Sequence, residues 1–310
     1  MKILITGGAG YIGSVLVEDL LKRKFSITVL DKFLYDETSL NHLYHYKNLN
    51  LIKGDVCDFS LIKSIIKNFD LIIPLAAYVG APLCDLDKIN SKKVNFDAMK
   101  MLFKSISKNQ VIIMPTTNSA YGTGDKNNEC TEKSALKPIS TYAKEKVKVE
   151  KILMEHPNYI SFRLATVFGM SPRMRMDLLV NDFVYKAIKE ETLVIFEGNF
   201  KRNYIHVKDV SRAFMFAIDN YKNMKNQIYN VGLSSANISK LELAQTIKKY
   251  IKELVIISEE FKKDKDQRNY IVSNAKIESK GYKPSYSLDD GIKELIKGFS
   301  HLKKYPYGNV

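Results

Sequence analysis

Residues 2–31 contain an apolar run, a glycine-rich turn, an amphipathic segment and a second apolar run in direct succession. The second run ends at Asp31, close to the spacing of about 20 residues at which an acid binds ribose hydroxyls. This order predicts strand, turn, helix and strand, the arrangement that binds a dinucleotide. Glycines let backbone N–H groups approach a pyrophosphate at the helix N-terminus. The turn has the spacing GxxGxxG, with Gly7, Gly10 and Gly13.

Apolar runs and amphipathic segments alternate through the first half of the chain. Strands are predicted at residues 49–55, 70–76 and 159–169 and within 111–122, and helices at 59–69, 89–108 and 139–156. Such alternation predicts right-handed crossovers and a doubly wound parallel sheet of the Rossmann type. Ligands gather at the C-terminal ends of such strands, where Asp31, Asp55 and the pair Ala76-Ala77 stand.

After residue 169 the chain changes to shorter strands and helices. We therefore expect an α/β protein with a smaller C-terminal α/β substrate-binding domain beside the Rossmann domain. The predicted cofactor domain covers residues 1–169 and about 203–232. The predicted substrate domain covers about 170–202 and 233–310, with the substrate in the cleft between the two.

Composition narrows the class of protein. No apolar run approaches the roughly 20 residues that span a bilayer, and the chain enters a strand too early for a signal peptide. Three scattered cysteines match no metal spacing, and they favour a reducing compartment. The net charge of +14 comes mainly from dispersed lysine, which is typical of a solvated surface. We expect a cytoplasmic protein that binds neither nucleic acid nor a membrane.

Tyr142 and Lys146 form a YxxxK pattern at the start of a predicted helix, so their side chains share one face. A phenol is a poor base at neutral pH, but a lysine ammonium and a positively charged nicotinamide favour the phenolate. Lowering its pKa by about 3 units corresponds to roughly 4 kcal/mol. Tyr142 then becomes a usable general base, with Thr117 at the end of a predicted strand.

With these residues in view, nearly the whole chain resembles the extended short-chain dehydrogenase/reductases, the sugar-nucleotide epimerase and dehydratase family. The resemblance rests on TGGAGYIG at residues 6–13, VNFDAMK at 94–100, TTNSAYG at 116–122 and RNYIHVKDV at 202–210. It implies three catalytic residues, Thr117, Tyr142 and Lys146, and no metal. Thr117 is implied to bind the sugar hydroxyl while Tyr142 takes its proton.

The resemblance also implies NAD as cofactor, since Asp31 repels the 2′-phosphate of NADP, although the neighbouring Lys32 offsets part of that repulsion. The implied cofactor contacts are Gly7, Gly10, Tyr11, Ile12, Gly13, Asp31, Lys32, Asp55, Val56, Leu75, Ala76, Ala77, Asn95, Thr116, Tyr142 and Lys146. The implied substrate contacts are Val79, Asn118, Ser119, Thr166, Arg173, Arg175, Asn181, Arg202 and Arg268. Thr166 departs from the asparagine usual at its position. Arginine suits a diphosphate because its planar fork binds bidentately.

The resemblance implies chemistry at C4 of a hexose or heptose linked to UDP, GDP or dTDP, in surface-polysaccharide biosynthesis. Asn118 and Ser119 replace the Asp-Glu pair of the dehydratases, and serine replaces the cysteine of the 3,5-epimerase/reductases. A 4-epimerase, a 4-dehydrogenase and a 4-keto reductase stay open. A non-catalytic NAD(P)-sensing protein is disfavoured because Tyr142 and Lys146 are both present. We also expect a homodimer through helices 89–108 and 139–156, with Met99 and Met154 facing outward.

Overall fold

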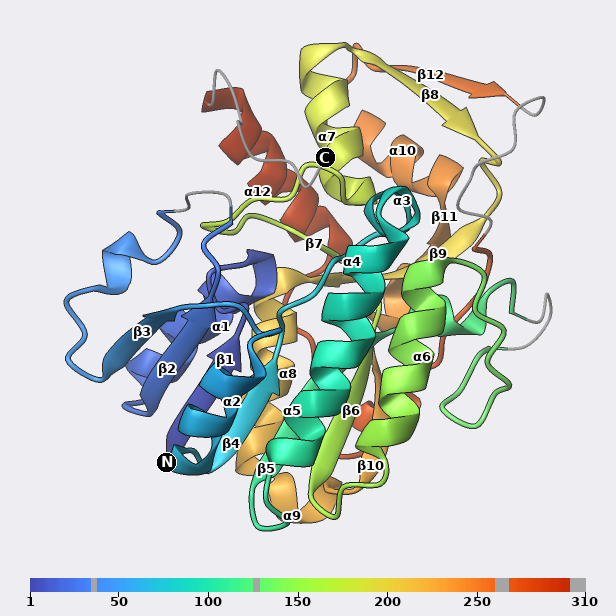
Figure 1. Cartoon of the computed structure of the whole chain (residues 1–310). Coiled ribbons are helices and arrows are strands. Elements are labelled where there is room, and N and C mark those ends of the chain that lie inside the picture. The colour runs from blue at the N-terminus through green and yellow to red at the C-terminus, as the bar shows by residue number, and fades with distance from the viewer. Residues whose placement is uncertain (35–37, 125–128, 260–267, 302–310) are drawn as a thin grey trace.

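Seven parallel strands form the central sheet of the computed structural model, which describes residues 1–34, 38–124, 129–259 and 268–301. Their order is β10-β6-β5-β4-β1-β2-β3 (Figure 1). The order reverses between β1 and β4, which is where ligands bind in doubly wound sheets. The strands are β1 Lys2–Thr6, β2 Ser26–Asp31, β3 Leu49–Lys53, β4 Leu71–Pro74, β5 Val111–Thr117, β6 Tyr159–Leu164 and β10 Gln227–Val231.

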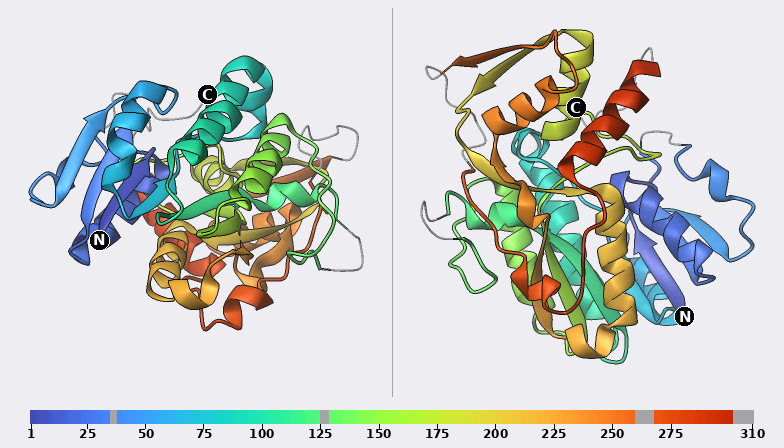
Figure 2. Two further views of the ribbon diagram at one scale, coloured as in Figure 1. Left: turned by 60° about the horizontal axis from the view of Figure 1, so that its bottom comes forward. Right: turned by 180° about the vertical axis from the view of Figure 1, so that it is seen from behind.

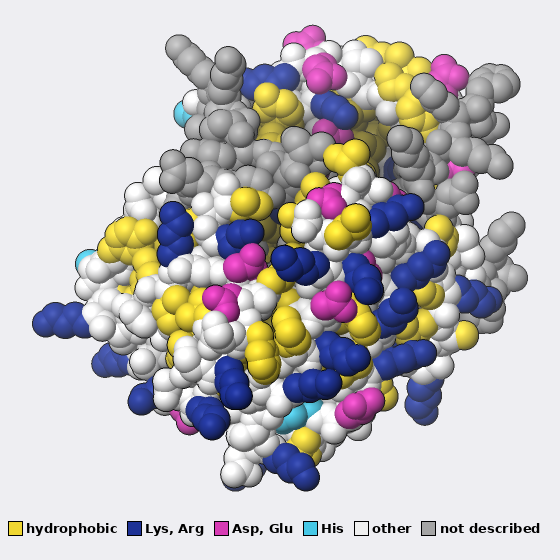
Figure 3. Space-filling view, in the orientation of Figure 1, with side chains coloured by type: hydrophobic (Ala, Val, Ile, Leu, Met, Phe, Trp, Pro, Cys, Tyr) yellow, Lys and Arg dark blue, Asp and Glu magenta, His cyan; other side chains and the backbone are white. Residues whose placement is uncertain are grey.

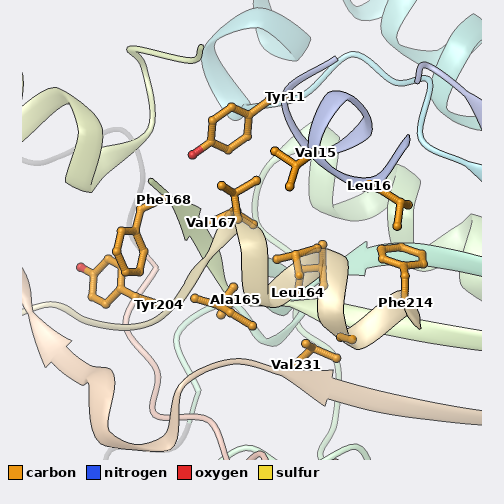
Figure 4. Packing of buried hydrophobic residues seen from close by; sticks show 14 of the residues in the cluster. Tyr11, Val15, Leu16, Leu164, Ala165, Val167, Phe168, Tyr204, Phe214 and Val231 are labelled. Carbon is orange, nitrogen blue, oxygen red and sulfur yellow. The ribbon is translucent and has the colours of Figure 1, made fainter. Parts of the chain in front are cut away.

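Helices cover both faces of this sheet (Figure 2). On one face α1 (Tyr11–Lys22) packs against α8 (Val207–Asp219), and α9 (Tyr221–Met224) follows. On the other face α5 (Met99–Ser105) packs against α2 (Phe59–Ile65) and α6 (Thr141–Leu153). The strands supply both cores because successive side chains point to opposite faces. In β1, Ile3 and Ile5 enter the first core, part of which Figure 4 shows, and Leu4 enters the second.

Two small sheets lie beyond the C-terminal ends of the central strands (Figure 1). One has the order β11-β9-β7 and the other pairs β12 with β8. Their strands are β7 Thr166–Phe168, β8 Thr192–Phe196, β9 Lys201–His206, β11 Asn237–Ser239 and β12 Val255–Glu259. The accompanying helices are α7 Leu179–Lys189, α10 Lys240–Lys248, α11 Ala275–Glu278 and α12 Leu288–His301.

The predicted fold class is confirmed, since the central sheet is parallel and helices flank it on both sides. The domain bounds stay a prediction. The strand predicted at 159–169 is divided at Ala165 between β6 in the central sheet and β7 in a small sheet. Among the helices that the structure describes, none has the length and apolar character needed to cross a membrane.

The helix predicted at 89–108 contains a π-helical turn, Lys93–Ala98, between α4 (Lys88–Lys92) and α5. A short helix, α3 (Ala81–Leu86), precedes it. A π turn holds more residues than an α turn and therefore shifts the residues that follow around the helix axis. The predicted outward position of Met99 is wrong, because its side chain is 1% exposed in the core. Met154 does face outward, with 49% of its surface exposed.

A buried ion pair fixes α6 on the central sheet. Arg163 of β6 and Glu150 of α6 lie 2.6 Å apart, and each side chain is 4% exposed. The hydroxyls of Thr116 and Ser161 also donate to Glu150 Oε2, at 2.9 and 2.8 Å. Because α6 holds Tyr142 and Lys146 and β5 ends at Thr117, this pair aligns the two elements that present the predicted catalytic residues.

Candidate active site

A cleft of about 1410 Å³ opens where the central strands end. Its walls come from the glycine turn, the loop after β4, the start of α6 and the segment between β7 and α7. A site for one small ligand typically measures about 300–1,000 Å³. The cleft therefore has room for a dinucleotide and a second ligand.

The glycine turn leaves no space for side chains. Gly7 has a φ of +73°, and a Cβ on it would lie 2.5 Å from the backbone nitrogen of Ala76. A Cβ on Gly13 would lie 2.6 Å from the carbonyl oxygen of Gly7. Gly10 precedes α1 and no side chain caps the first N–H groups of that helix. These N–H groups face the cleft side of the turn and fit a pyrophosphate.

Asp31 ends β2 and lines the cleft. Its carboxylate accepts hydrogen bonds from the backbone N–H of Ala9 at 3.0 Å and of Phe33 at 2.9 Å. Burial raises the pKa of Asp31, and these two hydrogen bonds oppose that rise. Each carboxylate oxygen keeps acceptor capacity for a ribose hydroxyl.

Lys32 turns away from Asp31 and toward Asp55. Its Nζ lies 3.2 Å from Asp55 Oδ2, so the lysine charge is compensated there. Burial tends to raise the pKa of Asp55, but hydrogen bonds from the Cys57 N–H and Lys32 outweigh it and hold that pKa below its usual value. Lys32, Asp55 and Val56 all line the cleft. No Lys or Arg occurs between residues 33 and 41, so the sequence supplies no further cation there for a 2′-phosphate.

The loop after β4 contributes Leu75, Ala76, Ala77 and Val79 to the cleft. Asn95 lies behind this loop rather than in the cleft lining. Its side chain accepts from the N–H of Tyr78 and donates to the carbonyl of Tyr78, both at 2.9 Å. The asparagine therefore holds the loop that lies beside the predicted cofactor position.

Glu145 is a buried residue that sequence reasoning missed. Its Oε2 accepts from Asn95 Nδ2 at 2.9 Å and from Ser91 Oγ at 2.6 Å. These contacts connect α6, next to Lys146, with the loop at Tyr78 through Asn95. A signal was present, since Glu145 stands three residues after Tyr142 and shares its helix face.

Thr117, Tyr142 and Lys146 line the same cleft. The Thr117 hydroxyl donates to Ser119 Oγ at 3.0 Å and accepts from the Ser119 N–H at 3.1 Å. Helix α6 begins just before Tyr142, with the Ser140 hydroxyl accepting from the Ala143 N–H at 3.2 Å. Lys146 Nζ lies 5.9 Å from the centre of the Tyr142 ring. The structure thus brings together the three residues predicted to be catalytic.

Burial acts against charge on both α6 side chains. It raises the pKa of Tyr142 to about 12, with Arg175 and Arg268 pulling in the opposite direction. It lowers the pKa of Lys146 to about 8. The lowered pKa predicted for Tyr142 is therefore not a property of the protein alone, and it requires the additional positive charge of a nicotinamide.

The lining of the cleft is rich in arginine. Four of the chain's seven arginines line the cleft, namely Arg173, Arg175, Arg202 and Arg268. Arg175 Nε bonds Asp177 Oδ1 at 3.0 Å, and Arg268 Nη1 donates to Ser119 Oγ. Arg163 of β6, by contrast, belongs to the ion pair with Glu150. Guanidinium groups in the lining of a cleft fit a diphosphate.

Three predicted substrate residues differ in their surroundings. Thr166 lines the cleft, and its Oγ1 has no hydrogen-bond partner among the described residues. Asn118 is fully buried outside the lining, and neither amide atom has a partner within the described ranges. Asn181 is also buried behind the lining, where it contacts Tyr11 and Arg175. The structure therefore brings Thr166 to the cleft, but neither asparagine.

His206 has a structural environment. It is fully buried, its Nε2 lies 2.7 Å from Glu294 Oε2, and its ring stacks on Tyr286. Burial tends to raise the pKa of Glu294, but hydrogen bonds from His206 and Lys208 outweigh it and lower that pKa to about 2. No group of three or more His, Cys, Asp or Glu side chains that could hold a metal occurs in the described parts of the chain.

Comparisons with known proteins agree with this geometry. The chain is 25% identical to mouse dTDP-D-glucose 4,6-dehydratase, over 96% of this chain and 88% of that one. It is also 25% identical to UDP-glucuronate 4-epimerase 2 of Arabidopsis thaliana, over 96% and 76%. The structure of Thermus thermophilus UDP-glucose 4-epimerase with NAD superimposes with a TM-score of 0.83 at 21% identity, covering 97% and 99% of the two chains. That likeness shows the fold.

The sequence model of one family matches residues 3–232, which include the glycine turn, Asp31 and all three predicted catalytic residues. The family is NAD-dependent, and the glycine turn and Asp31 fit that dinucleotide. The two homologues named above carry the names of enzymes that convert nucleotide sugars. The chain belongs to the NAD dependent epimerase/dehydratase family, and its cofactor is NAD.

Proposed function

We propose that the protein oxidises C4 of a nucleotide-linked hexose or heptose, and that it releases either the 4-keto sugar or its C4 epimer. One observation carries this proposal: Thr117, Tyr142 and Lys146 share a cleft with four arginines. A single nucleotide sugar would place its hydroxyl at the three catalytic residues and its diphosphate at the arginines. UDP, GDP and dTDP all provide that diphosphate, and a cytoplasmic homodimer making surface-polysaccharide precursors remains our expectation.

NAD, when bound in the cleft, would supply the hydride acceptor for this reaction. Thr117 orients the C4 hydroxyl by hydrogen bonding, and Tyr142 removes its proton. Lys146 favours the phenolate form of Tyr142 by its positive charge. Asn95 and Glu145 connect the loop at Tyr78 with α6. This connection would keep the Tyr142 ring of α6 in position during proton transfer.

Dehydration needs a further acid or base near C5 and C6, and the cleft offers little for it beside Thr117. Ser119 lines the cleft, but its hydroxyl is a poor acid or base near neutral pH and receives a hydrogen bond from Arg268. Asn118 does not ionise and lies outside the lining. These two positions support an oxidation that is not followed by loss of water, although some relatives are named as dehydratases.

The test is to supply the purified protein with a panel of UDP-, GDP- and dTDP-linked sugars, following NADH by absorbance and the sugar by NMR. Many turnovers to a C4 epimer without net NADH identify an epimerase. A 4-keto product with one equivalent of NADH identifies a 4-dehydrogenase. A 4,6-dehydrated product, or turnover undiminished in Tyr142→Phe, contradicts the proposal.

A 4-keto-sugar reductase is the second candidate. The same three residues serve this direction, because a protonated Tyr142 phenol can donate to a ketone oxygen. The discriminating measurement supplies NADH with a nucleotide-linked 4-keto sugar. Reduction that is much faster than oxidation of the corresponding alcohol, each near neutral pH, assigns the reductase direction.

A further inference from the structure

We propose that Tyr11 is a positioning residue whose hydroxyl ties the cofactor-binding turn to the loop 169–175, and so sets Arg175 for the nucleotide sugar. The inference rests on the proposed function in one respect, namely that this loop contacts the nucleotide diphosphate. The backbone of Tyr11 belongs to the dinucleotide turn, but its side chain extends away from that turn (Figure 4).

The Tyr11 hydroxyl has partners on both sides of the loop. It donates to the carbonyl of Gly169 at 2.6 Å and accepts from Asn181 Nδ2 at 3.3 Å. The same Asn181 amide donates to the carbonyl of Arg175 at 2.9 Å and accepts from the Gly169 N–H at 3.1 Å. One tyrosine hydroxyl and one amide therefore hold both ends of the loop. The ring itself is 6% exposed, and burial raises its pKa, so the hydroxyl stays protonated as a donor.

Two serines add a second connection between the same segments. Ser171 Oγ donates to the carbonyl of Tyr11 at 2.7 Å, and Ser14 Oγ lies 3.0 Å from Ser171 Oγ. Both Tyr11 and Ser14 belong to the first turn of α1, whose N–H groups fit the pyrophosphate. The turn that binds NAD is thus in direct contact with the loop that precedes α7.

The loop begins at a glycine that no other residue could replace without strain. Gly169 has a φ of +109°, and a Cβ on it would lie 2.3 Å from His206 Nε2. Beyond Gly169, the loop leads to Arg175, whose guanidinium bonds Asp177 and lines the cleft near Gly80. Loss of the Tyr11 hydroxyl leaves the Gly169 carbonyl and one Asn181 hydrogen without a partner, which a shift of the loop relieves.

The variant Tyr11→Phe removes the hydroxyl and keeps the ring that packs in the core. Its matched control is Tyr282→Phe, because Tyr282 is also buried and donates to the carbonyl of Asp209 at 2.7 Å, outside the cleft lining. NAD is titrated into each protein first. UDP, GDP and dTDP are then titrated into the NAD-saturated proteins, and the nucleotide that binds wild type most tightly is compared across the variants.

We expect Tyr11→Phe to bind that nucleoside diphosphate about 3- to 10-fold more weakly, as for loss of one buried hydrogen bond. The NAD dissociation constant changes less than about twofold in both variants, since the backbone contacts remain. Hydrogen exchange at residues 169–178, measured with NAD bound, becomes faster in Tyr11→Phe only. A merely structural role would alter both variants alike, as both lose one buried hydroxyl.

Two results overturn the inference separately from the proposed function. If wild type binds a nucleoside diphosphate and Tyr11→Phe binds it equally well, with unchanged exchange in the loop, the positioning role is wrong. An equal loss in Tyr282→Phe also contradicts it. If wild type binds none of the three nucleotides with NAD present, the proposed nucleotide-sugar function fails, and the assignment of the loop fails with it.

Discussion

Lys146 is a buried cation that suits the proposed proton transfer but lowers the free energy of unfolding. Burial lowers its pKa to about 8 from 10.5, so the unfolded chain binds more protons than the folded protein between those values. The free energy of unfolding therefore rises with pH across this window. Below it, keeping the ammonium inside costs up to about 3 kcal/mol.

The variant Lys146→Met should accordingly be inactive and yet more stable than wild type. We expect the variant's free energy of unfolding to exceed that of wild type at about pH 7. The difference should shrink by about pH 10, where wild-type Lys146 is mostly neutral. Chemical denaturation of the cofactor-free proteins at both pH values measures this difference. Lys144→Met is the control, since Lys144 is exposed on the same helix. Wild type that is as stable as Lys146→Met at the lower pH would contradict this expectation.

Asp31 is the residue that we expect to determine the preference for NAD(H) over NADP(H). With Lys32 paired to Asp55, no other cation in residues 26–34, the described part of the chain around the end of β2, offsets the repulsion between Asp31 and a 2′-phosphate. We expect Asp31→Ala to raise the ratio of NADH to NADPH dissociation constants at least about 10-fold, the effect of about 1.4 kcal/mol. Fluorescence titration gives both constants, and a ratio cancels any general loss of binding. Asp70→Ala, at the other end of the sheet, should leave it unchanged.

At the level of elements, the ion pair between Glu150 and Arg163 determines how α6 lies on β6. Removing one partner of a buried pair leaves the other charge uncompensated, at a cost of about 3–5 kcal/mol. We therefore expect Glu150→Gln to lose about that much stability in urea denaturation. Glu18→Gln breaks the exposed pair with Lys22 and should cost less than about 1 kcal/mol. Equal losses in the two variants would show that burial does not matter here.

The elements also show which features a sequence can and cannot reveal. Apolar runs that alternate with amphipathic segments predicted the parallel sheet, because a strand buried on both faces is a nearly continuous apolar run. The π turn at Lys93–Ala98 left no such pattern, and it brought Met99 inward and Asn95 behind the Tyr78 loop. The contacts of Tyr11 and Asn181 join segments far apart in sequence. Spacing arguments work within one element, so they could not find the contact between these two residues.

For the whole molecule, the surface over α4, α5 and α6 mixes apolar patches with lysines (Figure 3). Among the large apolar side chains there, Ile89 is 82% exposed, and Met154 is exposed as well. We expect this face to form the proposed homodimer. Ile89→Glu should then shift the protein toward monomer in light scattering, while Val194→Glu, at an exposed site on β8, should not. A wild-type monomer at every concentration tested would contradict the dimer.

The place of β10 in the central sheet has a consequence for how the protein is made. This strand pairs with β6, yet α7, β8, β9 and α8 lie between the two in the chain. During synthesis, β6 leaves the ribosome as a bare sheet edge and must wait for the whole intervening segment before its neighbour arrives. Nascent chains that stop within that segment keep the edge open, so they are the species that chaperones must shield. The central sheet is therefore completed only after the intervening residues 165–226, which include the small-sheet strands β7, β8 and β9, have been made.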